Sequence, residues 1–125
     1  MSLDVTLSRT LYLSYDKGKT YKDQQEEVYW ANITHNLNKM AMEVSVQHHT
    51  LYEYLWRPEE LEITKASELI YPLTIGLAKL KDNPDFYKTF DSPNGWGLYE
   101  HFVPFVEKYL EACIANPECT VYVGR

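Results

Sequence analysis

The sequence has little cysteine, since Cys113 and Cys119 are the only two in the chain. Two cysteines are too few for a disulfide framework and fit no metal-binding spacing, so we expect reduced thiols. Long apolar runs are also absent, and none approaches the roughly 20 residues of a transmembrane helix. The first residues lack the basic and then apolar pattern of a signal peptide. We therefore expect a cytoplasmic protein that does not enter a membrane.

Basic residues are scarce as well. The chain has 12 Lys and Arg against 18 Asp and Glu, which gives a net charge of −6. Nucleic-acid binding needs a basic face, so this balance argues against direct contact with nucleic acid. An acidic surface does suit a basic partner, and one hypothesis is an acidic protein that blocks a nucleic-acid-binding partner.

Signatures of catalysis and of metal binding are missing too. Gly18-Lys19-Thr20 resembles the end of a phosphate-binding loop, but Leu13 stands where that motif requires Gly. The chain has four histidines, at positions 35, 48, 49 and 101, and they form no His-Glu-x-x-His pattern. We therefore expect neither a metal nor a cofactor.

What the chain does have is the composition of one globular domain. It has 125 residues, of which 45% are hydrophobic, enough for a modest core without cross-links. Tyrosine is over-used, with 11 residues. Because tyrosine combines an apolar ring with a hydroxyl, it suits half-buried surfaces and protein interfaces.

Period-two patterns mark strands near both ends. Apolar residues occupy odd positions from Leu3 to Tyr15 except at Arg9, which predicts a long strand with a bulge or turn near residues 8–10. Residues 16–19 predict a turn in which Gly18 takes a positive φ. We expect the polar residues 20–27 to form either a hairpin arm or a mobile loop. Residues 27–31 form either a strand or the approach to a helix, and residues 120–123 form the last strand.

Helical patterns fill the middle of the chain. Ile33, Leu37, Met40 and Val44 have the spacing of one buried stripe, which predicts a helix over residues 33–46 capped by Asn32. Two short helices are expected next, one over residues 51–55 that follows the capping box Thr50-x-x-Glu53 and one that begins at Pro58. A longer helix is expected over residues 64–81, with Thr64 as its cap and a kink at Pro72. The last two helices are expected over residues 84–90 and 98–113, the second with an interruption at Pro104. The sequence thus predicts an α+β, mostly helical single domain, with a small antiparallel sheet joining the N- and C-terminal strands.

The candidate site consists of polar and aromatic residues for which packing in a core offers the least explanation. We expect His35, Asn36, Trp96 and Glu100 to line one cleft. An alternative is a small hydrolase in which His35 and Glu100 form an acid/base pair. A helix dipole alone also favours a Glu at position 100.

Trp56 and Arg57 are a second candidate for binding. Trp and Arg are the usual anchors of protein interfaces. The same pair is equally typical of a core Trp beside an Arg that pairs with a Glu at a helix start, and the sequence does not separate these two interpretations.

Three unusual segments resemble an uncharacterised family of small phage- and prophage-encoded proteins. They are Asn32–Ala41, Leu55–Leu61 and Asn94–Ala112. The resemblance covers most of residues 28–125, while residues 15–26 look longer than it suggests. It implies a small protein of the host cytoplasm and implies nothing about catalysis. The missing catalytic signature, the small acidic chain and its aromatic and Arg residues favour a non-enzymatic accessory or binding protein, which acts through contacts with a protein partner of unknown identity.

Overall fold

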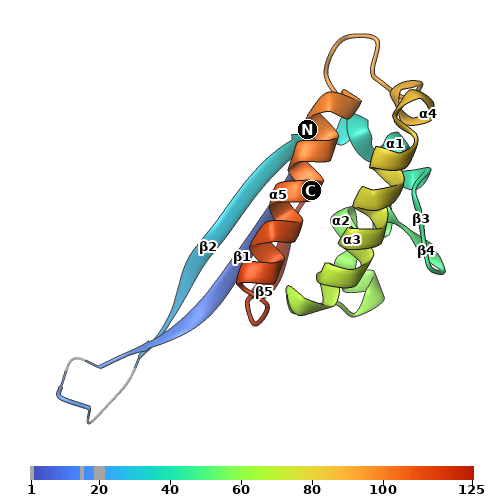
Figure 1. Cartoon of the computed structure of the whole chain (residues 1–125). Coiled ribbons are helices and arrows are strands. Elements are labelled where there is room, and N and C mark those ends of the chain that lie inside the picture. Colours follow the sequence, from blue (N-terminus) through green and yellow to red (C-terminus); the bar gives the residue numbers. More distant parts are fainter. Residues whose placement is uncertain (1, 15, 19–21) are drawn as a thin grey trace.

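A three-stranded sheet joins the two ends of the chain (Figure 1). The computed structural model describes residues 2–14, 16–18 and 22–125. β1 (Ser2–Leu13) lies between β2 (Lys22–Thr34) and β5 (Thr120–Gly124), and it is antiparallel to both. Val5 lies opposite Val123, as expected for paired terminal strands. The predicted α+β class and the sheet that joins the termini are therefore confirmed.

β1 alternates between the two faces of the sheet, as its pattern predicts. Its inward side chains Leu3, Val5 and Leu7 are fully buried. The register with β2 shifts between Leu7 and Ser8, where β2 contributes the extra residue Val28. The bulge expected near residues 8–10 is thus present at the start of that range, and its extra residue comes from the neighbouring strand.

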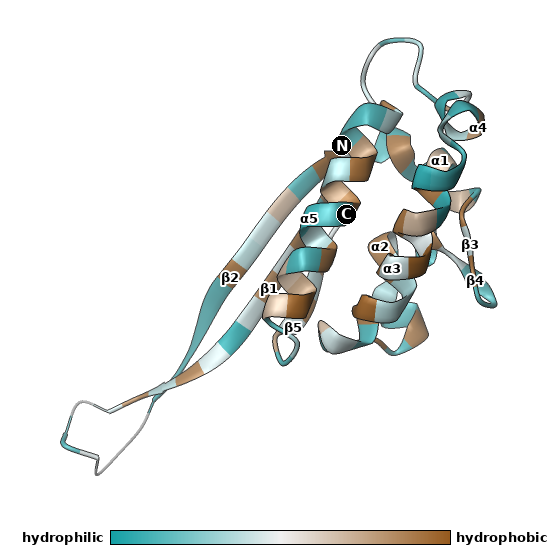
Figure 2. Ribbon diagram, in the orientation of Figure 1, coloured by the Kyte–Doolittle hydropathy of each residue, from teal (hydrophilic) through white to brown (hydrophobic). Residues whose placement is uncertain are grey.

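Beyond the helices, β1 and β2 continue as a two-stranded arm that projects from the body (Figure 1). Figure 2 shows that polar residues dominate this part of β2. Lys17 and Gly18 have φ values of 59° and 87°, which confirms the positive φ expected at Gly18. From Lys22 onward the polar segment is the hairpin arm, and residues 27–31 are strand. The end of the predicted turn and the start of the polar segment fall on residues 19–21, which with residue 15 lie outside the described residues.

The helix expected over residues 33–46 is wrong. β2 continues to Thr34, and only short helices follow, η1 (His35–Leu37) and α1 (Asn38–Met42). The cap is Thr34 rather than Asn32, since the Thr34 side chain accepts from the Asn36 N–H at 3.3 Å. Ile33 pairs with Leu3 in the sheet, so this long-range pairing overrides the helical spacing.

The chain then turns through a small hairpin before the next helices. β3 (Ser45–Val46) pairs with β4 (His49–Thr50), and Gln47 between them has a φ of 57°. The capping box of Thr50 and Glu53 begins the next helix, as predicted. The remaining helices are α2 (Leu51–Trp56), η2 (Pro58–Leu61), α3 (Ser67–Asp82), α4 (Pro84–Lys88) and α5 (Tyr99–Ala115).

Proline has less effect on the last helix than its position in the sequence suggests. α5 runs through Pro104 without a break, so the interruption expected there is wrong. Pro104 is exposed, whereas Phe102, Phe105 and Val106 around it are buried. Packing of these neighbours holds the helix although Pro104 lacks a backbone donor.

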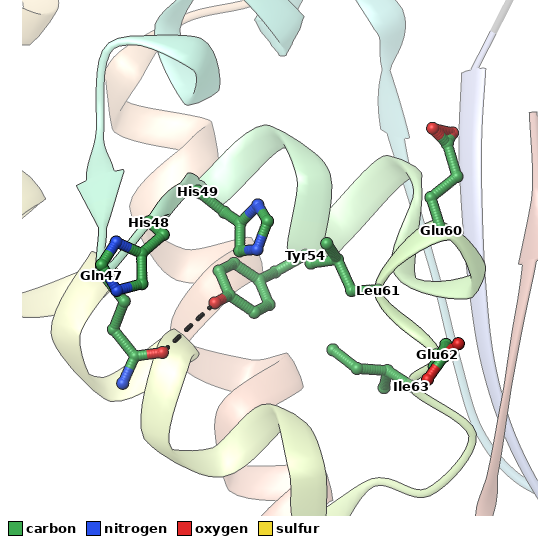
Figure 3. Close-up of a pocket in the computed structure, with 8 residues that line it drawn as sticks. All are labelled: Gln47, His48, His49, Tyr54, Glu60, Leu61, Glu62 and Ile63. Carbon is green, nitrogen blue, oxygen red and sulfur yellow. Dashed lines mark hydrogen bonds between the residues drawn. The ribbon is translucent and has the colours of Figure 1, made fainter.

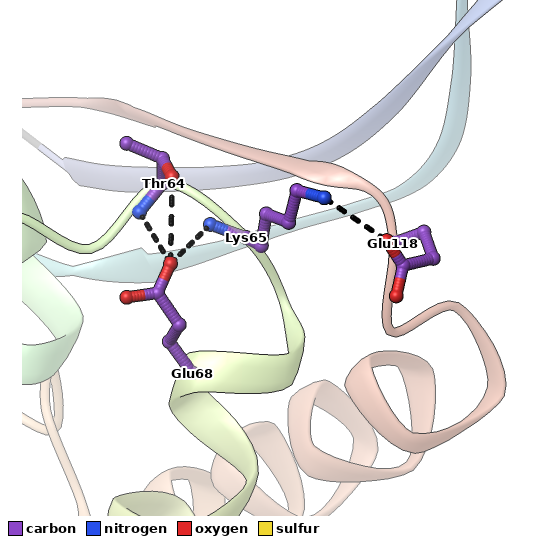
Figure 4. Close-up of polar contacts among 4 residues, drawn as sticks. All are labelled: Thr64, Lys65, Glu68 and Glu118. Carbon is purple, nitrogen blue, oxygen red and sulfur yellow. Dashed lines mark hydrogen bonds and ion pairs between the residues drawn. The ribbon is translucent and has the colours of Figure 1, made fainter.

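The start of α3 also differs from its prediction. The helix begins at Ser67, and Thr64 is not its N-cap residue. Instead, the Glu68 carboxylate accepts from the Thr64 and Lys65 backbone N–H groups at 3.2 and 3.1 Å (Figure 4). These two donors are the main reason that the pKa of Glu68 is lowered.

The helices gather on one side of the sheet (Figure 1). α5 packs on its inner face, where the Tyr29 and Tyr109 rings stack with centroids 6.0 Å apart, and α3 packs against α5. The two cysteines are buried as free thiols, and burial raises the pKa of Cys113 to about 12. Among the described residues, no helix has both the length and the apolar character to cross a membrane.

Candidate functional site

The loop before α5 has a fixed shape because its own polar groups satisfy one another. The Ser92 N–H donates to the Gly97 carbonyl at 3.0 Å, and the Gly95 N–H donates to the Ser92 carbonyl at 3.1 Å. The Asn94 Oδ1 accepts from the Trp96 N–H at 2.9 Å. Gly95 and Gly97 have φ values of 78° and 118°, which L side chains rarely adopt. These hydrogen bonds therefore hold the backbone of the loop, and with it the Cα of Trp96, in one place.

Asn36 of η1 ties this loop to the end of β2. Its Nδ2 donates to the Trp96 carbonyl at 2.7 Å. The approach is close, since a Cβ atom at Gly97 would lie 2.8 Å from the Asn36 Cβ. Glycine at position 97 is thus required both by its φ and by the nearness of η1.

Trp96 is the most exposed of the large hydrophobic side chains described, at 70%. It lines a hollow of about 550 Å³ with Thr34, His35 and Asn36. It also borders a neighbouring hollow of about 390 Å³, together with Asn32 and other residues of the β2 end. We call the first of these the Trp96 hollow. The structure therefore brings together three of the four residues that were expected to share a cleft.

His35 is fixed by a contact that the sequence did not indicate. The Trp56 Nε1–H donates to the His35 Nδ1 at 3.1 Å. An indole nitrogen can only donate, so Nδ1 is the acceptor and the ring proton of His35 lies on Nε2. The Nε2 atom is buried and has no hydrogen-bond partner among the described residues.

Glu100, the fourth expected residue, is not among the residues that line these hollows. Its side chain is 70% exposed, and its carboxylate lies 3.8 Å from the Nε2 of His101. His101 borders the second hollow in its place. The contacts of His35 and Glu100 therefore give no support to an acid/base pair between them.

Trp56 and Arg57 take the places that the core interpretation describes. Trp56 is 1% exposed and stacks on Tyr52, with the ring centroids 5.4 Å apart, so it is not available to a partner. Arg57 lies 3.7 Å from Glu60, a carboxylate of the first turn of η2. A hydrogen bond with Tyr52 is the main reason that the pKa of Arg57 is raised.

A separate hollow of about 410 Å³ lies beside the β3–β4 turn (Figure 3). It is lined by Gln47, His48, His49, Tyr54, Glu60, Leu61, Glu62 and Ile63. The His49 Nδ1 lies 2.9 Å from the Glu53 carboxylate, and the Tyr54 hydroxyl donates to the Gln47 Oε1 at 3.4 Å. Over residues 2–14, 16–18 and 22–125, no three His, Cys, Asp or Glu side chains form a group that could hold a metal ion.

The exposed Trp30 is not among the site residues predicted from the sequence, because residues 27–31 fit either a strand or the approach to a helix. Trp30 of β2 is 55% exposed and faces away from the helices. The signal was available, since Tyr29 and Trp30 must face opposite sides once residues 27–31 are strand. Comparison with known proteins adds no assignment, because no protein-family model, curated protein or solved structure matches the chain.

Proposed function

We propose that the protein is a non-enzymatic binding protein that holds a protein partner through Trp96 and the Trp96 hollow. One observation carries the proposal: an indole that is 70% exposed stands on a loop with internal hydrogen bonds. Tryptophan is the residue type most enriched among interface anchors. A loop whose backbone is already held by hydrogen bonds loses less conformational entropy when a partner binds.

The surroundings of Trp96 support a protein contact better than catalysis. Thr34 and Asn36 supply hydroxyl and amide groups at the rim of the hollow. The histidine at the site has its Nδ1 occupied by Trp56 and its Nε2 buried, so neither ring nitrogen is open to a substrate. An exposed aromatic centre with a polar rim is the usual composition of a protein interface.

The sequence suggests in which biological context the protein binds its partner. The resemblance of Asn32–Ala41, Leu55–Leu61 and Asn94–Ala112 to small phage and prophage proteins makes a phage or prophage accessory role the proposal. The partner is then a protein of the host cytoplasm. The first and third of these segments carry the residues of the Trp96 hollow.

The proposal is tested by capture of partners from host lysate with the wild-type chain and two variants. Trp96→Ala removes the anchor. Tyr71→Ala is the matched control, because Tyr71 is 62% exposed on α3 and lines none of the hollows described above. We expect one protein to be retained by the wild type and by Tyr71→Ala and to be lost with Trp96→Ala.

Salt then separates this anchor from a charge-driven contact. Retention through an indole should persist when the ionic strength is raised, whereas retention through surface charge should weaken steeply. If Trp96→Ala retains the same proteins as the wild type, the proposal is wrong. Turnover of an ester or phosphoester by the purified chain, abolished by His35→Ala, would support the hydrolase alternative instead.

A further inference from the structure

The helices of the described residues lie on one side of the sheet and leave its second face uncovered (Figure 1). Strand alternation and register place Asp4 and Thr6 of β1, Glu27 and Trp30 of β2, and Tyr122 of β5 on this side. We call these five residues the outer sheet face. Trp30 is 55% and Tyr122 51% exposed. The face is separate from the Trp96 hollow, since none of its residues lines that hollow.

Two aromatic rings of this face stand in one row across the sheet. Thr6 lies directly opposite Trp30 on one side and Tyr122 on the other. Neighbouring strands are about 4.8 Å apart, so the aromatic residues start about 10 Å apart, with the small Thr6 between them. This separation leaves room for one long side chain of a partner to lie over Thr6 and between the two rings.

The charged groups of the face have one sign. Asp4 and Glu27 lie in the rows on either side of Thr6, and Glu27 is exposed. No Lys or Arg occupies an outward position in residues 2–8, 27–34 and 120–124. Cations do border the face, and carboxylates hold them. Glu118 holds the Lys65 ammonium at 3.0 Å (Figure 4), and Glu26 holds Arg9, which follows Ser8 in β1. Glu59 holds Arg125, which directly follows β5 and lines a hollow with Tyr122.

We infer that the outer sheet face binds a basic protein segment, with an Arg or Lys side chain lying between Trp30 and Tyr122. The aromatic rings attract the cation of that side chain and cover its aliphatic stem. Asp4 and Glu27 attract further basic residues of the same segment. This surface goes beyond the role proposed for Trp96 and does not depend on it.

The exposed rings and the carboxylates of the outer sheet face argue against two other occupants, single-stranded RNA and a second copy of the chain. Exposed aromatic residues on a sheet also stack the bases of single-stranded RNA, but that mode relies on a positively charged surface for the phosphates. A second copy packed face to face would bring the carboxylates of Asp4 and Glu27 near those of its mate, which is unfavourable. A basic segment is the occupant that satisfies both the rings and the carboxylates.

The test uses fluorescently labelled peptides of alternating Arg and Gly, with peptides of alternating Glu and Gly as the control, and labelled oligouridylate as the rival. Binding is measured by anisotropy for the wild type, Trp30→Ala, Tyr122→Ala and the surface control Tyr71→Ala. The chain has three tryptophans, so their indole N–H signals in an NMR spectrum report separately on Trp30, Trp56 and Trp96.

We expect the Arg peptide to bind, with affinity that falls as salt rises. Trp30→Ala and Tyr122→Ala should each weaken binding by about three- to fivefold, the usual size of an exposed cation–π contact. Tyr71→Ala should leave affinity unchanged. The Trp30 indole signal should shift on titration while the Trp96 signal stays in place.

Four results would overturn the inference. Two of them are affinities: equal affinity for the Arg and Glu peptides, or tighter binding of oligouridylate than of the Arg peptide. The third is a shift of the Trp96 signal in place of the Trp30 signal. The fourth is a dimer in light scattering that Trp30→Ala converts to a monomer. The last result would assign the face to a second copy. None of them bears on whether Trp96→Ala loses its partner, so this inference and the proposed function can fail separately.

Discussion

Tyr29 and Trp30 are neighbours in β2, and they show how differently the two faces of the sheet are used. Tyr29 points inward and stacks on Tyr109 at an interplanar angle of 10°. Burial is the main reason that the pKa of Tyr29 is raised. Trp30 points outward and is 55% exposed. One residue thus belongs to the core that α5 completes, and the next is left available for contact.

This difference teaches that aromatic content alone does not mark an interface. Buried Trp56 and Tyr109 have the same residue types as exposed Trp96 and Tyr122, and only their positions in the fold separate them. Substitutions on the inner face should therefore change stability, and those on the outer face should change binding alone. Variants at Tyr109 and Trp30 test this contrast directly and should have the largest and the smallest effects on stability, with variants at Gly97 and Glu68 between them.

Tyr109→Ala should give the largest loss of stability. Tyr109 is fully buried on the inner face and contacts both Tyr29 and Phe105. Removing a buried aromatic ring costs about 3–5 kcal/mol of unfolding free energy, through lost burial and the cavity that remains. Urea denaturation followed by circular dichroism measures this change.

Tyr109→Phe is the matched control for that variant. The Tyr109 hydroxyl is buried and has no hydrogen-bond partner among the described residues. Removing an unpaired buried hydroxyl should be neutral or stabilise the fold by up to about 1 kcal/mol. A loss with Tyr109→Phe as large as with Tyr109→Ala would show that the hydroxyl, and not the ring, matters at this position.

The inner face is also the part of the fold that the sequence predicted best. Apolar residues at alternate positions predicted β1, and the matching pattern at residues 120–123 predicted the strand that pairs with it. The segment from Ile33 was predicted wrongly because its apolar spacing fits a helix as well as a strand end. Pairing of Ile33 with Leu3, 30 positions earlier in the chain, decides between them, and no local pattern contains it.

The candidate site was predicted only in part, for the same reason. His35, Asn36 and Trp96 do meet, although 60 positions separate Asn36 from Trp96. The pairing of Trp56 with His35 was not foreseen, because it depends on how α2 packs beside η1. The prediction for Glu100 failed because the sequence does not give the rotation of α5 about its axis. That rotation places His101, and not Glu100, at the border of the second hollow.

Gly97→Ala should have the next largest effect and shows whether Trp96 is held as firmly as the core residues. The φ of 118° is unfavourable for alanine, and its Cβ would lie 2.8 Å from the Asn36 Cβ. We expect a loss of about 1–3 kcal/mol. Gly95→Ala is the control, since Gly95 also has a positive φ, of 78°, but no atom lies within 4 Å of the added Cβ.

The comparison of these two glycines separates strain from crowding. Gly95→Ala should cost less than Gly97→Ala, and only Gly97→Ala should shift the Trp96 indole signal in an NMR spectrum. Equal effects of both variants on stability and on that signal would mean that η1 does not hold the loop.

Glu68→Gln should have a smaller effect, which depends on pH. The pKa of Glu68 is lowered in the folded state, chiefly by the Lys65 and Thr64 N–H donors, so its carboxylate favours folding when ionised. This contribution is present above the ordinary pKa of a glutamate and is lost as the pH falls through the folded value. Because the side chain is exposed, we expect a loss of about 0.5–1 kcal/mol at neutral pH.

Melting temperatures at neutral and acidic pH measure that effect. The difference between the wild type and Glu68→Gln should shrink as the pH falls below the glutamate range. Glu118→Gln is the control, because Glu118 is an exposed partner of Lys65 and lies outside the helix start. A difference that stays constant with pH would contradict a role for the ionised carboxylate.

Trp30→Thr should have the smallest effect on stability, although it removes the largest side chain of the outer sheet face. Threonine keeps the preference for a β-strand, so the substitution tests the side-chain contacts of Trp30 alone. We expect a change within about 0.5 kcal/mol, as is usual for an exposed position without special contacts. Tyr29→Thr is its matched neighbour and should cost several times more, because it removes the stack on Tyr109. Equal losses from the two variants in urea denaturation would mean that the outer face is packed in solution, and the contrast between the two faces would then be wrong.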